Sequence, residues 1–284
     1  MLNSLIPSLP SLLTLLVIGI FFGIILSLAK KKLKVEKDPK IEKVLNLLPG
    51  ANCGACGQPG CAGYATKIVT EGADPSLCPV ADEKNLKEIG NLMGLTLEHN
   101  KNPLIARIHC QGGKAETTNK FIYDGPQICK AAHDLADGFK TCQFGCLGLG
   151  ECVQACPFEA IYMGENQLPI VIPEKCTGCG KCVEVCPRDI ISLLPQKIKV
   201  YVKCKNTEKA PKMKEGCQVG CIGCRLCVKA CEEIQAKVKN PKVKSAIEVE
   251  NFLAVIDYEH CLNCGKCALA CQKQEVIAFK TKRV

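Results

Sequence analysis

The 284-residue chain contains no tryptophan, and aromatic residues make up only 5% of it. The usual large core-filling side chains are therefore scarce, so something other than a large hydrophobic core must hold the fold together. The sequence also has no glycine-rich dinucleotide loop between a strand and a helix, no phosphate-binding loop and no flavin fingerprint. These absences argue against a nucleotide or flavin site in this chain.

Histidine is also sparse, and the residues are scattered as His99, His109, His133 and His260. None stands at metal-ligand spacing from another, so we expect them on the surface or beside ligands rather than as ligands. Nothing in the sequence indicates hydrolytic or nucleophilic chemistry. We therefore predict no catalytic residue in the usual sense.

Charge is absent from the first 29 residues, and the stretch from Leu12 to Ala29 is almost entirely apolar. A run of roughly 20 apolar residues is long enough to cross a bilayer as a helix, so residues 1–29 are predicted to form one transmembrane helix. A cleaved signal peptide carries positive charge before its apolar run, whereas here lysines follow it as Lys30, Lys31, Lys32 and Lys34. The positive-inside rule then predicts a single-pass protein of the cell inner (cytoplasmic) membrane, with the C-terminal domains in the cytoplasm. Residues 30–48 are predicted as a basic linker and a short helix.

What the chain has in abundance is cysteine, with 24 residues. Disulfides are implausible in the reducing cytoplasm, and zinc ribbons use separated C-x-x-C pairs. The repeated C-x-x-C-x-x-C spacing with a further cysteine is instead the run found in bacterial ferredoxins. The formal charge of +9 ignores the clusters; six oxidised clusters of about −2 each would make the loaded protein mildly acidic, so no nucleic acid partner is expected.

A small [4Fe-4S] domain is predicted over residues 49–100. Its glycine-rich loop allows the backbone to wrap closely around a cluster, which argues against zinc. The expected ligands are Cys53, Cys56, Cys61 and Cys78.

The rest of the chain is an internal repeat. "ENQLPIVIPEKCTGCGKCVEVCP" at 165–187 resembles "ENFLAVIDYEHCLNCGKCALAC" at 250–271, and each unit opens with a strand-like run that ends in a cysteine, Cys110 or Cys204. We therefore expect two ferredoxin-like modules, over 101–200 and 201–284. The predicted fold class is α+β, with one N-terminal transmembrane helix, a small four-iron cluster domain and tandem two-cluster ferredoxin-like modules.

In a two-cluster ferredoxin, three cysteines of one motif share a cluster with the fourth cysteine of the other motif. This rule predicts three complete sets, namely Cys156, Cys176, Cys179 and Cys182; Cys221, Cys224, Cys227 and Cys271; and Cys231, Cys261, Cys264 and Cys267.

The motif "CQFGCLGLGECVQACP" at 142–157 lacks one cysteine, because Leu149 stands where the second module has Cys224. We expect Cys142 to complete a set with Cys146, Cys152 and Cys186, although Cys129 and Cys142 could exchange roles. The remaining four cysteines would then form a sixth cluster bridging the modules, or be plain buried thiols. This last set is Cys110, Cys129, Cys204 and Cys217.

The uncharged N-terminal helix, the module at Cys53 and motifs such as "CLGLGECVQACPFEAI" together resemble the B subunit of the Rnf (Rsx) electron-transport complex in its longer form, over essentially the whole chain. The resemblance implies a membrane translocase complex that passes electrons from reduced ferredoxin toward NAD and exports Na⁺ or H⁺. It implies that this subunit is an electron-carrying part, with other membrane and peripheral subunits as partners and soluble ferredoxin as donor. Flavins and the NAD site would belong to other subunits.

Two other functions remain open at this point. One is a membrane-anchored polyferredoxin subunit of another redox complex, such as a hydrogenase or reductase, and the other is a structural or redox-sensing metal protein. The segment 197–214 holds seven lysines against Glu208 alone, which indicates a solvated loop or a docking patch for an acidic redox carrier.

Overall fold

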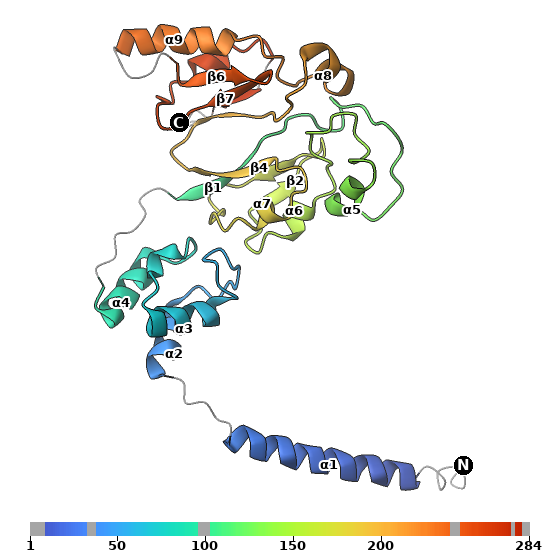
Figure 1. Cartoon of the computed structure of the whole chain (residues 1–284), viewed down its shortest axis with the longest axis vertical. Coiled ribbons are helices and arrows are strands. Elements are labelled where there is room, and N and C mark those ends of the chain that lie inside the picture. Colours follow the sequence, from blue (N-terminus) through green and yellow to red (C-terminus); the bar gives the residue numbers. More distant parts are fainter. Residues whose placement is uncertain (1–8, 33–37, 96–102, 239–244, 274–275, 280–284) are drawn as a thin grey trace. The chain divides into compact units, whose positions relative to one another are not determined.

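The computed structural model of the chain describes residues 9–32, 38–95, 103–238, 245–273 and 276–279. The chain divides into two compact units, residues 1–43 and residues 44–284. Figure 1 shows the order of the elements along the chain.

The first unit contains the long helix α1, Leu9–Lys32. Its large apolar side chains between Leu13 and Leu28 are 43–70% exposed. Within the described residues, no helix combines the length and the apolar character needed to span a membrane. The transmembrane helix expected over residues 1–29 therefore stays a prediction.

A small helical region follows, with α2 (Pro39–Leu47), α3 (Cys61–Glu71), the short 3₁₀ helix η2 (Pro75–Leu77) and α4 (Glu83–Met93). The helix expected before Pro49 is confirmed by α2. Tyr64 and Ile68 of α3 and Ile89 of α4 are almost completely buried. The Tyr64 hydroxyl donates a 2.6 Å hydrogen bond to the Asp74 carbonyl, so the one large aromatic side chain of this core has a partner for its polar end.

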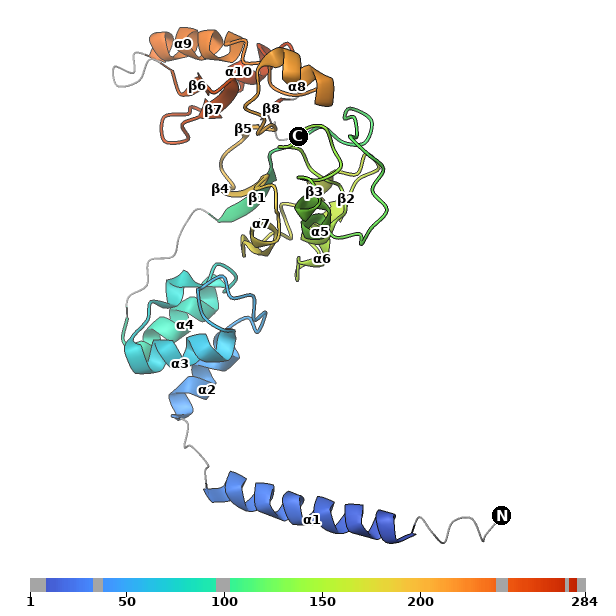
Figure 2. The ribbon, with the colours of Figure 1, turned by 45° about the vertical axis from the view of Figure 1, so that its right-hand side comes forward.

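The expected repeat is confirmed by two modules with the same strand plan (Figures 1 and 2). In each, the first strand pairs antiparallel with the last, and an antiparallel hairpin lies between them in the sequence. The first module contains β1 (Leu104–Ile108), α5 (Cys129–Asp134), α6 (Glu151–Gln154), β2 (Ile161–Met163), β3 (Pro169–Val171), α7 (Lys181–Glu184) and β4 (Ile191–Pro195). The second contains β5 (Val200–Val202), α8 (Ala210–Gly216), α9 (Leu226–Val238), β6 (Ile247–Glu250), β7 (Leu253–Ile256), α10 (Lys266–Leu269) and β8 (Ile277–Phe279).

Short helices begin inside the cysteine motifs, directly after a residue with positive φ. Gly150, Gly180 and Gly265 have φ of 79°, 82° and 75° and precede α6, α7 and α10. Glycine adopts this left-handed conformation without a steric penalty, which allows a ligand loop to turn sharply into a helix. Arg225 takes the same role before α9, with φ of 61°.

Each module has its own apolar core, and cysteines are part of both. In the second module Val200, Val228, Ile247 and Ile277 pack around cysteines, and in the first Ala106, Ile161, Ile190 and Ile191 do so. Buried aliphatic residues therefore surround the cysteine loops and exclude water from them.

Candidate metal centres

The small N-terminal region brings its predicted cysteines to one loop, which we call site 1 (Cys53, Cys56, Cys61 and Cys78). Asn52, with φ of 47°, accepts a 2.8 Å hydrogen bond from the Cys61 backbone N–H, which ties the loop to the start of α3. Burial raises the pKa of the Cys78 thiol, and the nearby Cys56 and Cys53 thiols raise it further. This influence places Cys53, Cys56 and Cys78 near one another.

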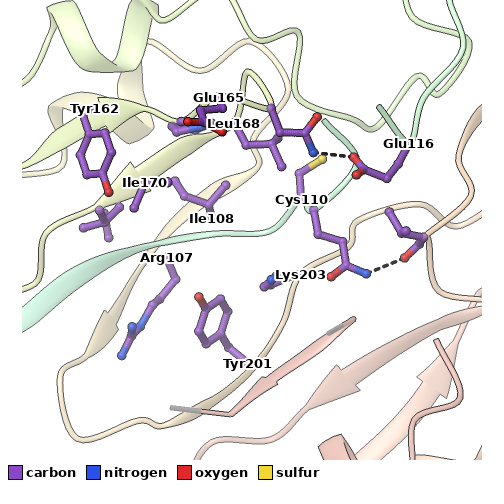
Figure 3. Close-up of a pocket in the computed structure, with 17 residues that line it drawn as sticks. Arg107, Ile108, Cys110, Glu116, Tyr162, Glu165, Leu168, Ile170, Tyr201 and Lys203 are labelled. Carbon is purple, nitrogen blue, oxygen red and sulfur yellow. Dashed lines mark hydrogen bonds between the residues drawn. The ribbon is translucent and has the colours of Figure 1, made fainter. Parts of the chain in front are cut away.

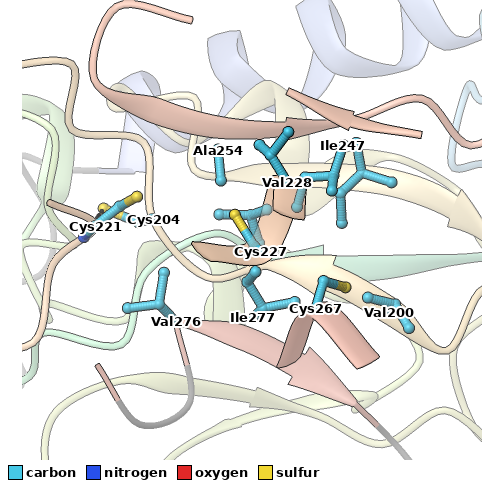
Figure 4. Close-up of a cluster of buried hydrophobic side chains, with 12 residues drawn as sticks. Val200, Cys204, Cys221, Cys227, Val228, Ile247, Ala254, Cys267, Val276 and Ile277 are labelled. Atoms are coloured by element: carbon cyan, nitrogen blue, oxygen red, sulfur yellow. Dashed lines mark hydrogen bonds between the residues drawn. The ribbon is translucent and has the colours of Figure 1, made fainter. Parts of the chain in front are cut away.

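The second module brings together two complete sets, in agreement with the motif rule. Site 4 (Cys221, Cys224, Cys227 and Cys271) lines one pocket, and site 5 (Cys231, Cys261, Cys264 and Cys267) lines another. Figure 4 shows Cys221, Cys227 and Cys267 among the buried aliphatic side chains of this module. Cys224 of site 4 and Cys264 of site 5 are exposed.

In the first module, site 3 (Cys156, Cys176, Cys179 and Cys182) also gathers as predicted. Burial raises the pKa of Cys182 to about 12, with contributions from Cys176 and Cys179 and smaller ones from Cys152 and Cys156. Backbone N–H groups reach the sulfurs, since Ala106 donates to Cys176 at 3.4 Å and Ala160 donates to Cys156 at 3.3 Å.

The remaining set of the first module differs from the expectation. Cys146, Cys152 and Cys186 share a pocket with Cys129, and Cys142 does not line it. Cys129 begins α5, and the next backbone N–H, of Lys130, donates a 3.0 Å hydrogen bond to Glu151 of α6. That bond fixes the start of α5 beside the motif, so Cys129 stands where Cys142 was expected. We call this set site 2 (Cys129, Cys146, Cys152 and Cys186).

The expected sixth set changes in the same way. Cys142 lines a pocket together with Cys110, Cys204 and Cys217, and Cys129 does not line it. We call this set the bridging site (Cys110, Cys142, Cys204 and Cys217), because two of its residues come from each module. Cys129 and Cys142 have thus exchanged the roles expected of them: Cys129 lies in site 2 and Cys142 lies in the bridging site.

The spacing of the sulfurs fits clusters better than single ions. A tetrahedral zinc with bonds of about 2.3 Å holds its sulfurs about 3.8 Å apart. Among the described residues, one group has three potential ligand atoms within 4.8 Å of one another, and it consists of Asp257, Glu259 and His260. No three cysteine sulfurs among these residues are therefore as close together as the ligands of a zinc site, although four of the sets each line one pocket.

Burial also leaves these thiols dependent on a metal for ionisation. It raises the pKa of Cys152, Cys204 and Cys267 to about 12 in each case, and of Cys227 to about 11. Without a cation such thiols stay neutral at pH 7, and metal binding displaces their protons. The thiol-only donor set, the spacing and the surrounding glycines together fit four-iron clusters.

Two buried cations, which motif reasoning missed, lie near site 2 and the bridging site. Lys140 is 3% exposed and donates to the Gly112 carbonyl at 3.4 Å, and it counteracts the increase in pKa that burial causes at Cys110 and Cys146. Arg188 is 9% exposed, donates to the Asp137 carbonyl and lies close enough to Cys142 and Cys186 to interact with both. No local pattern in the sequence marks these two residues as buried.

A further cleft, with a volume of about 880 Å³, lies beside the bridging site (Figure 3). Cys110 is the only cysteine on its walls, which also carry Arg107, Tyr162, Tyr201 and Lys203. The walls mix apolar, aromatic and charged side chains without a convergent catalytic group, so we assign no substrate to this cleft.

Comparison with known proteins agrees with the division into modules. A family described as "Putative Fe-S cluster" matches residues 48–80, and a "4Fe-4S dicluster domain" family matches twice, over 141–193 and 220–274. Four cysteines outside site 1 lie beyond these ranges, namely Cys110, Cys129, Cys204 and Cys217.

Three relatives, each named as the B subunit of its complex, match most of the chain. That of an ion-translocating oxidoreductase complex from Methanosarcina acetivorans is 41% identical over 91% of this chain and 94% of its own length. That of a Na⁺-translocating ferredoxin:NAD⁺ oxidoreductase complex from Acetobacterium woodii is 40% identical over 90% of this chain and 73% of its own length. That of a proton-translocating ferredoxin:NAD⁺ oxidoreductase complex from Clostridium ljungdahlii is 36% identical over 90% of this chain and 86% of its own length. With this identity over nearly the whole length, and cysteine sets suited to four-iron clusters, the chain belongs to the family of B subunits of ion-translocating oxidoreductase (Rnf) complexes.

Proposed function

We propose that this chain is the multi-cluster electron-transfer subunit of a ferredoxin:NAD oxidoreductase complex that translocates Na⁺ or H⁺. The observation that carries the proposal is that four pockets are each lined by four cysteines, in a chain whose relatives are named as subunits of such complexes. Four-iron clusters held at these sites supply one-electron carriers. We assign the chain no substrate or nucleotide site of its own, so its part in the catalysis of the complex is to relay electrons to partner subunits.

The residues around the sites support transfer without large rearrangement. Aliphatic side chains exclude water from the cysteine loops, and backbone N–H groups at 3.3–3.4 Å from Cys156 and Cys176 can stabilise negative charge on sulfur. Burial, hydrogen bonds to sulfur and nearby charge are the means by which a protein tunes cluster potentials. The exposed cysteines of sites 4 and 5 offer places where a redox partner can approach closely.

Soluble ferredoxin is the electron donor in this proposal, and the second module is its docking surface. Segment 197–214 exposes Lys197, Lys199, Lys209 and Lys214, while Lys212 pairs with Glu208 at 2.6 Å. An acidic carrier would be steered to such a surface at low ionic strength. Reversing Lys209 and Lys214 to glutamate should slow reduction by ferredoxin several-fold at low salt and have little effect at high salt.

Helix α1 is the membrane anchor in this proposal, as a single pass with the cluster modules on the cytoplasmic side. Its support is the uncharged run before Lys30 and the apolar side chains exposed along the helix. The full chain should stay in the membrane fraction during washes at high pH and high salt, and a chain without residues 1–32 should be released by them. If the full chain were attached only through basic residues, high salt alone would release it.

The experiment that tests the function uses the whole complex, purified anaerobically with this chain in place. Reduced ferredoxin should bleach the cluster absorbance of the complex, and electrons should then reach NAD through the flavin-bearing subunits. A complex that lacks flavin-bearing subunits, or that exchanges electrons with hydrogen instead of NAD, would overturn the proposal in favour of a hydrogenase or reductase polyferredoxin.

A further inference from the structure

The bridging site is built from two pairs of residues that occupy equivalent positions in the repeat. Cys110 follows β1 by two residues and Cys204 follows β5 by two residues. Cys142 stands four residues before Cys146, and Cys217 stands four residues before Cys221. The site therefore has the two-fold pattern of a site formed between two copies of one module.

The contacts of the first pair repeat as well. The Cys146 backbone N–H donates to the Cys110 sulfur at 3.3 Å, and the equivalent Cys221 N–H donates to the Cys204 sulfur at 3.4 Å. Each of these sulfurs thus accepts a hydrogen bond from the backbone of a cysteine in the neighbouring cluster motif, Cys146 or Cys221. Such N–H donors stabilise a charged sulfur, and a neutral thiol acting as a plain apolar filler would not require them.

The two modules are joined by backbone hydrogen bonds around this site. Residues 111–118 of the first module run beside residues 215–219 of the second, with Gln218 N–H donating to the Glu116 carbonyl at 2.9 Å and Thr118 N–H donating to the Gly216 carbonyl at 3.3 Å. Thr117 and Cys217 form an isolated antiparallel bridge. These bonds fix the distance between Cys110 and Cys217, so the four sulfurs are held by the fold.

Glycines permit this close approach. A Cβ atom on Gly112 would lie 2.9 Å from the Cys217 sulfur, and one on Gly216 would lie 2.9 Å from the Cys142 nitrogen. Neither position has room for a side chain. Chain segments from both modules therefore reach the site at van der Waals distance.

The interior of the site resembles the other cluster sites. Its pocket has a cavity of about 20 Å³, the same as the pockets of sites 2, 4 and 5. Cys142, Cys204 and Cys217 are 6%, 9% and 7% exposed. The fully buried Asn206 directs its amide nitrogen to the Cys142 sulfur at 3.5 Å, which places a polar donor against one sulfur of the set.

We propose that Cys110, Cys142, Cys204 and Cys217 bind a sixth four-iron cluster, which the two ferredoxin-like modules hold jointly and which carries electrons between them. The proposal deepens the electron-transfer function above and rests on it for the direction of flow. One electron arrives from a reduced cluster of one module, which is thereby oxidised by one electron, and one electron leaves to an oxidised cluster of the other. No bond is made or broken and no proton is required. The site also links the modules covalently through metal, so it stabilises their contact.

The test is an iron and acid-labile sulfide count on the anaerobically purified full chain, combined with alanine variants in pairs. The unchanged chain should hold about 24 irons. The Cys142→Ala variant should lose one cluster. The Cys110→Ala, Cys142→Ala double variant should also lose only one cluster, because both residues serve one site. The matched Cys129→Ala, Cys142→Ala double variant should lose two clusters, because Cys129 serves site 2 and Cys142 serves the bridging site.

Three results would overturn the proposal. The first is about 20 irons in the unchanged chain, with or without one zinc. The second is a Cys110→Ala, Cys142→Ala double variant that loses two clusters, and the third is a Cys142→Ala variant that retains all its iron.

A second measurement does not depend on a cysteine variant folding. Asn206→Leu removes the donor to the Cys142 sulfur, so the potential of one cluster should become more negative in a redox titration followed by electron paramagnetic resonance. The control is Asn166→Leu, which removes the hydrogen bonds of the Asn166 side chain to Glu116 and to the Ala115 backbone N–H and no contact to sulfur. Identical titrations for Asn206→Leu and the unchanged chain would contradict a cluster at this site. Loss of ferredoxin-dependent reduction with all six clusters intact would instead count against the electron-transfer function alone.

Discussion

The two ferredoxin-like modules share one strand plan but differ in how they complete their first cluster site. In the second module Cys224 lies inside the motif, whereas the first module has Leu149 there and takes Cys129 from α5. Both equivalent segments contain one helix, α5 or α8, but the segment of the first module is longer: Cys142 lies 32 positions after Cys110, whereas Cys217 lies 13 positions after Cys204. The longer segment brings Cys129 to site 2 from outside the motif.

The modules also differ beyond the motifs. Pro157 directly follows Cys156, and α6 ends at Gln154, whereas Cys231 is followed by Glu232 and α9 continues to Val238. Proline cannot continue a helix, so α6 cannot extend through Pro157 as α9 extends through Glu232. Exposed cysteines occur only in the second module among the described residues. The second module is accordingly the more open one, and the first is the more enclosed.

The sharpest way to break the comparison is to convert the first module into the pattern of the second. Cys129→Ala should remove the site 2 cluster and about four irons. Adding Leu149→Cys should restore them, because Gly148 and Gly150, with φ of 80° and 79°, already provide the turn in which a motif cysteine sits. Iron content and the electron paramagnetic resonance spectrum of the reduced chain measure both steps. Leu149→Cys alone is the control and should leave the count unchanged; equal iron in Cys129→Ala and the unchanged chain would show that Cys129 is no ligand.

The next prediction concerns the residues that precede the second pair of bridging cysteines. These equivalent positions hold Thr141 and Gly216, and a Cβ on Gly216 would lie 2.9 Å from the Cys142 nitrogen and 3.1 Å from the Thr141 carbonyl carbon. Gly216→Ala should therefore destabilise the folded chain by roughly 1–3 kcal/mol, the usual cost of overpacking. The free energy of unfolding, measured anaerobically in denaturant, checks this.

Gly145→Ala is the matched control for that measurement. A Cβ there would lie 3.5 Å from the Cys142 sulfur, which is ordinary contact. This variant should change the free energy of unfolding much less. Equal effects of the two alanines would mean that the close approach at Gly216 does not matter for stability.

The sequence predicts much of this molecule, because cluster motifs and strand periodicity are local. The positions of sites 1, 3, 4 and 5, the two modules and the strands before Cys110 and Cys204 all follow from spacing. The exchange of Cys129 and Cys142 does not follow from spacing, because Cys142, which is nearer to the motif in the sequence, is not the cysteine that the fold brings to site 2. The repeat holds the missing signal: Cys142 aligns with Cys217, so the two belong in one set, and Cys129 is then the residue without a counterpart. The burial of Lys140 depends on how the modules pack, which no local pattern records.

Lys140 gives the modules different charges at equivalent positions. It is buried beside Cys110 and Cys146, whereas its counterpart Glu215 is exposed. Lys140→Met should make the potentials of the site 2 cluster and the bridging cluster more negative, by roughly 30–60 mV, a three- to tenfold change in the reduced-to-oxidised ratio. A redox titration followed by electron paramagnetic resonance measures the shift. The control is the exposed Lys120, whose change to Met should shift no potential; unchanged titrations in Lys140→Met would remove the proposed role of this charge.

The smallest expected effect concerns His109, whose counterpart in the second module is Lys203. The His109 ring lies between the Val202 carbonyl and the Ser192 hydroxyl, each at 2.6 Å, so it joins β4 of the first module to β5 of the second. Burial lowers the pKa of His109. The unfolded chain therefore takes up a proton at this residue that the folded chain does not, and stability should fall as the pH drops through the ordinary histidine range near 6.5. His109→Gln should weaken the contact between the modules at neutral pH yet flatten the dependence of the free energy of unfolding on pH between about 7 and 5.5. An unchanged slope in this variant would mean that the acid sensitivity of the junction comes from groups other than His109.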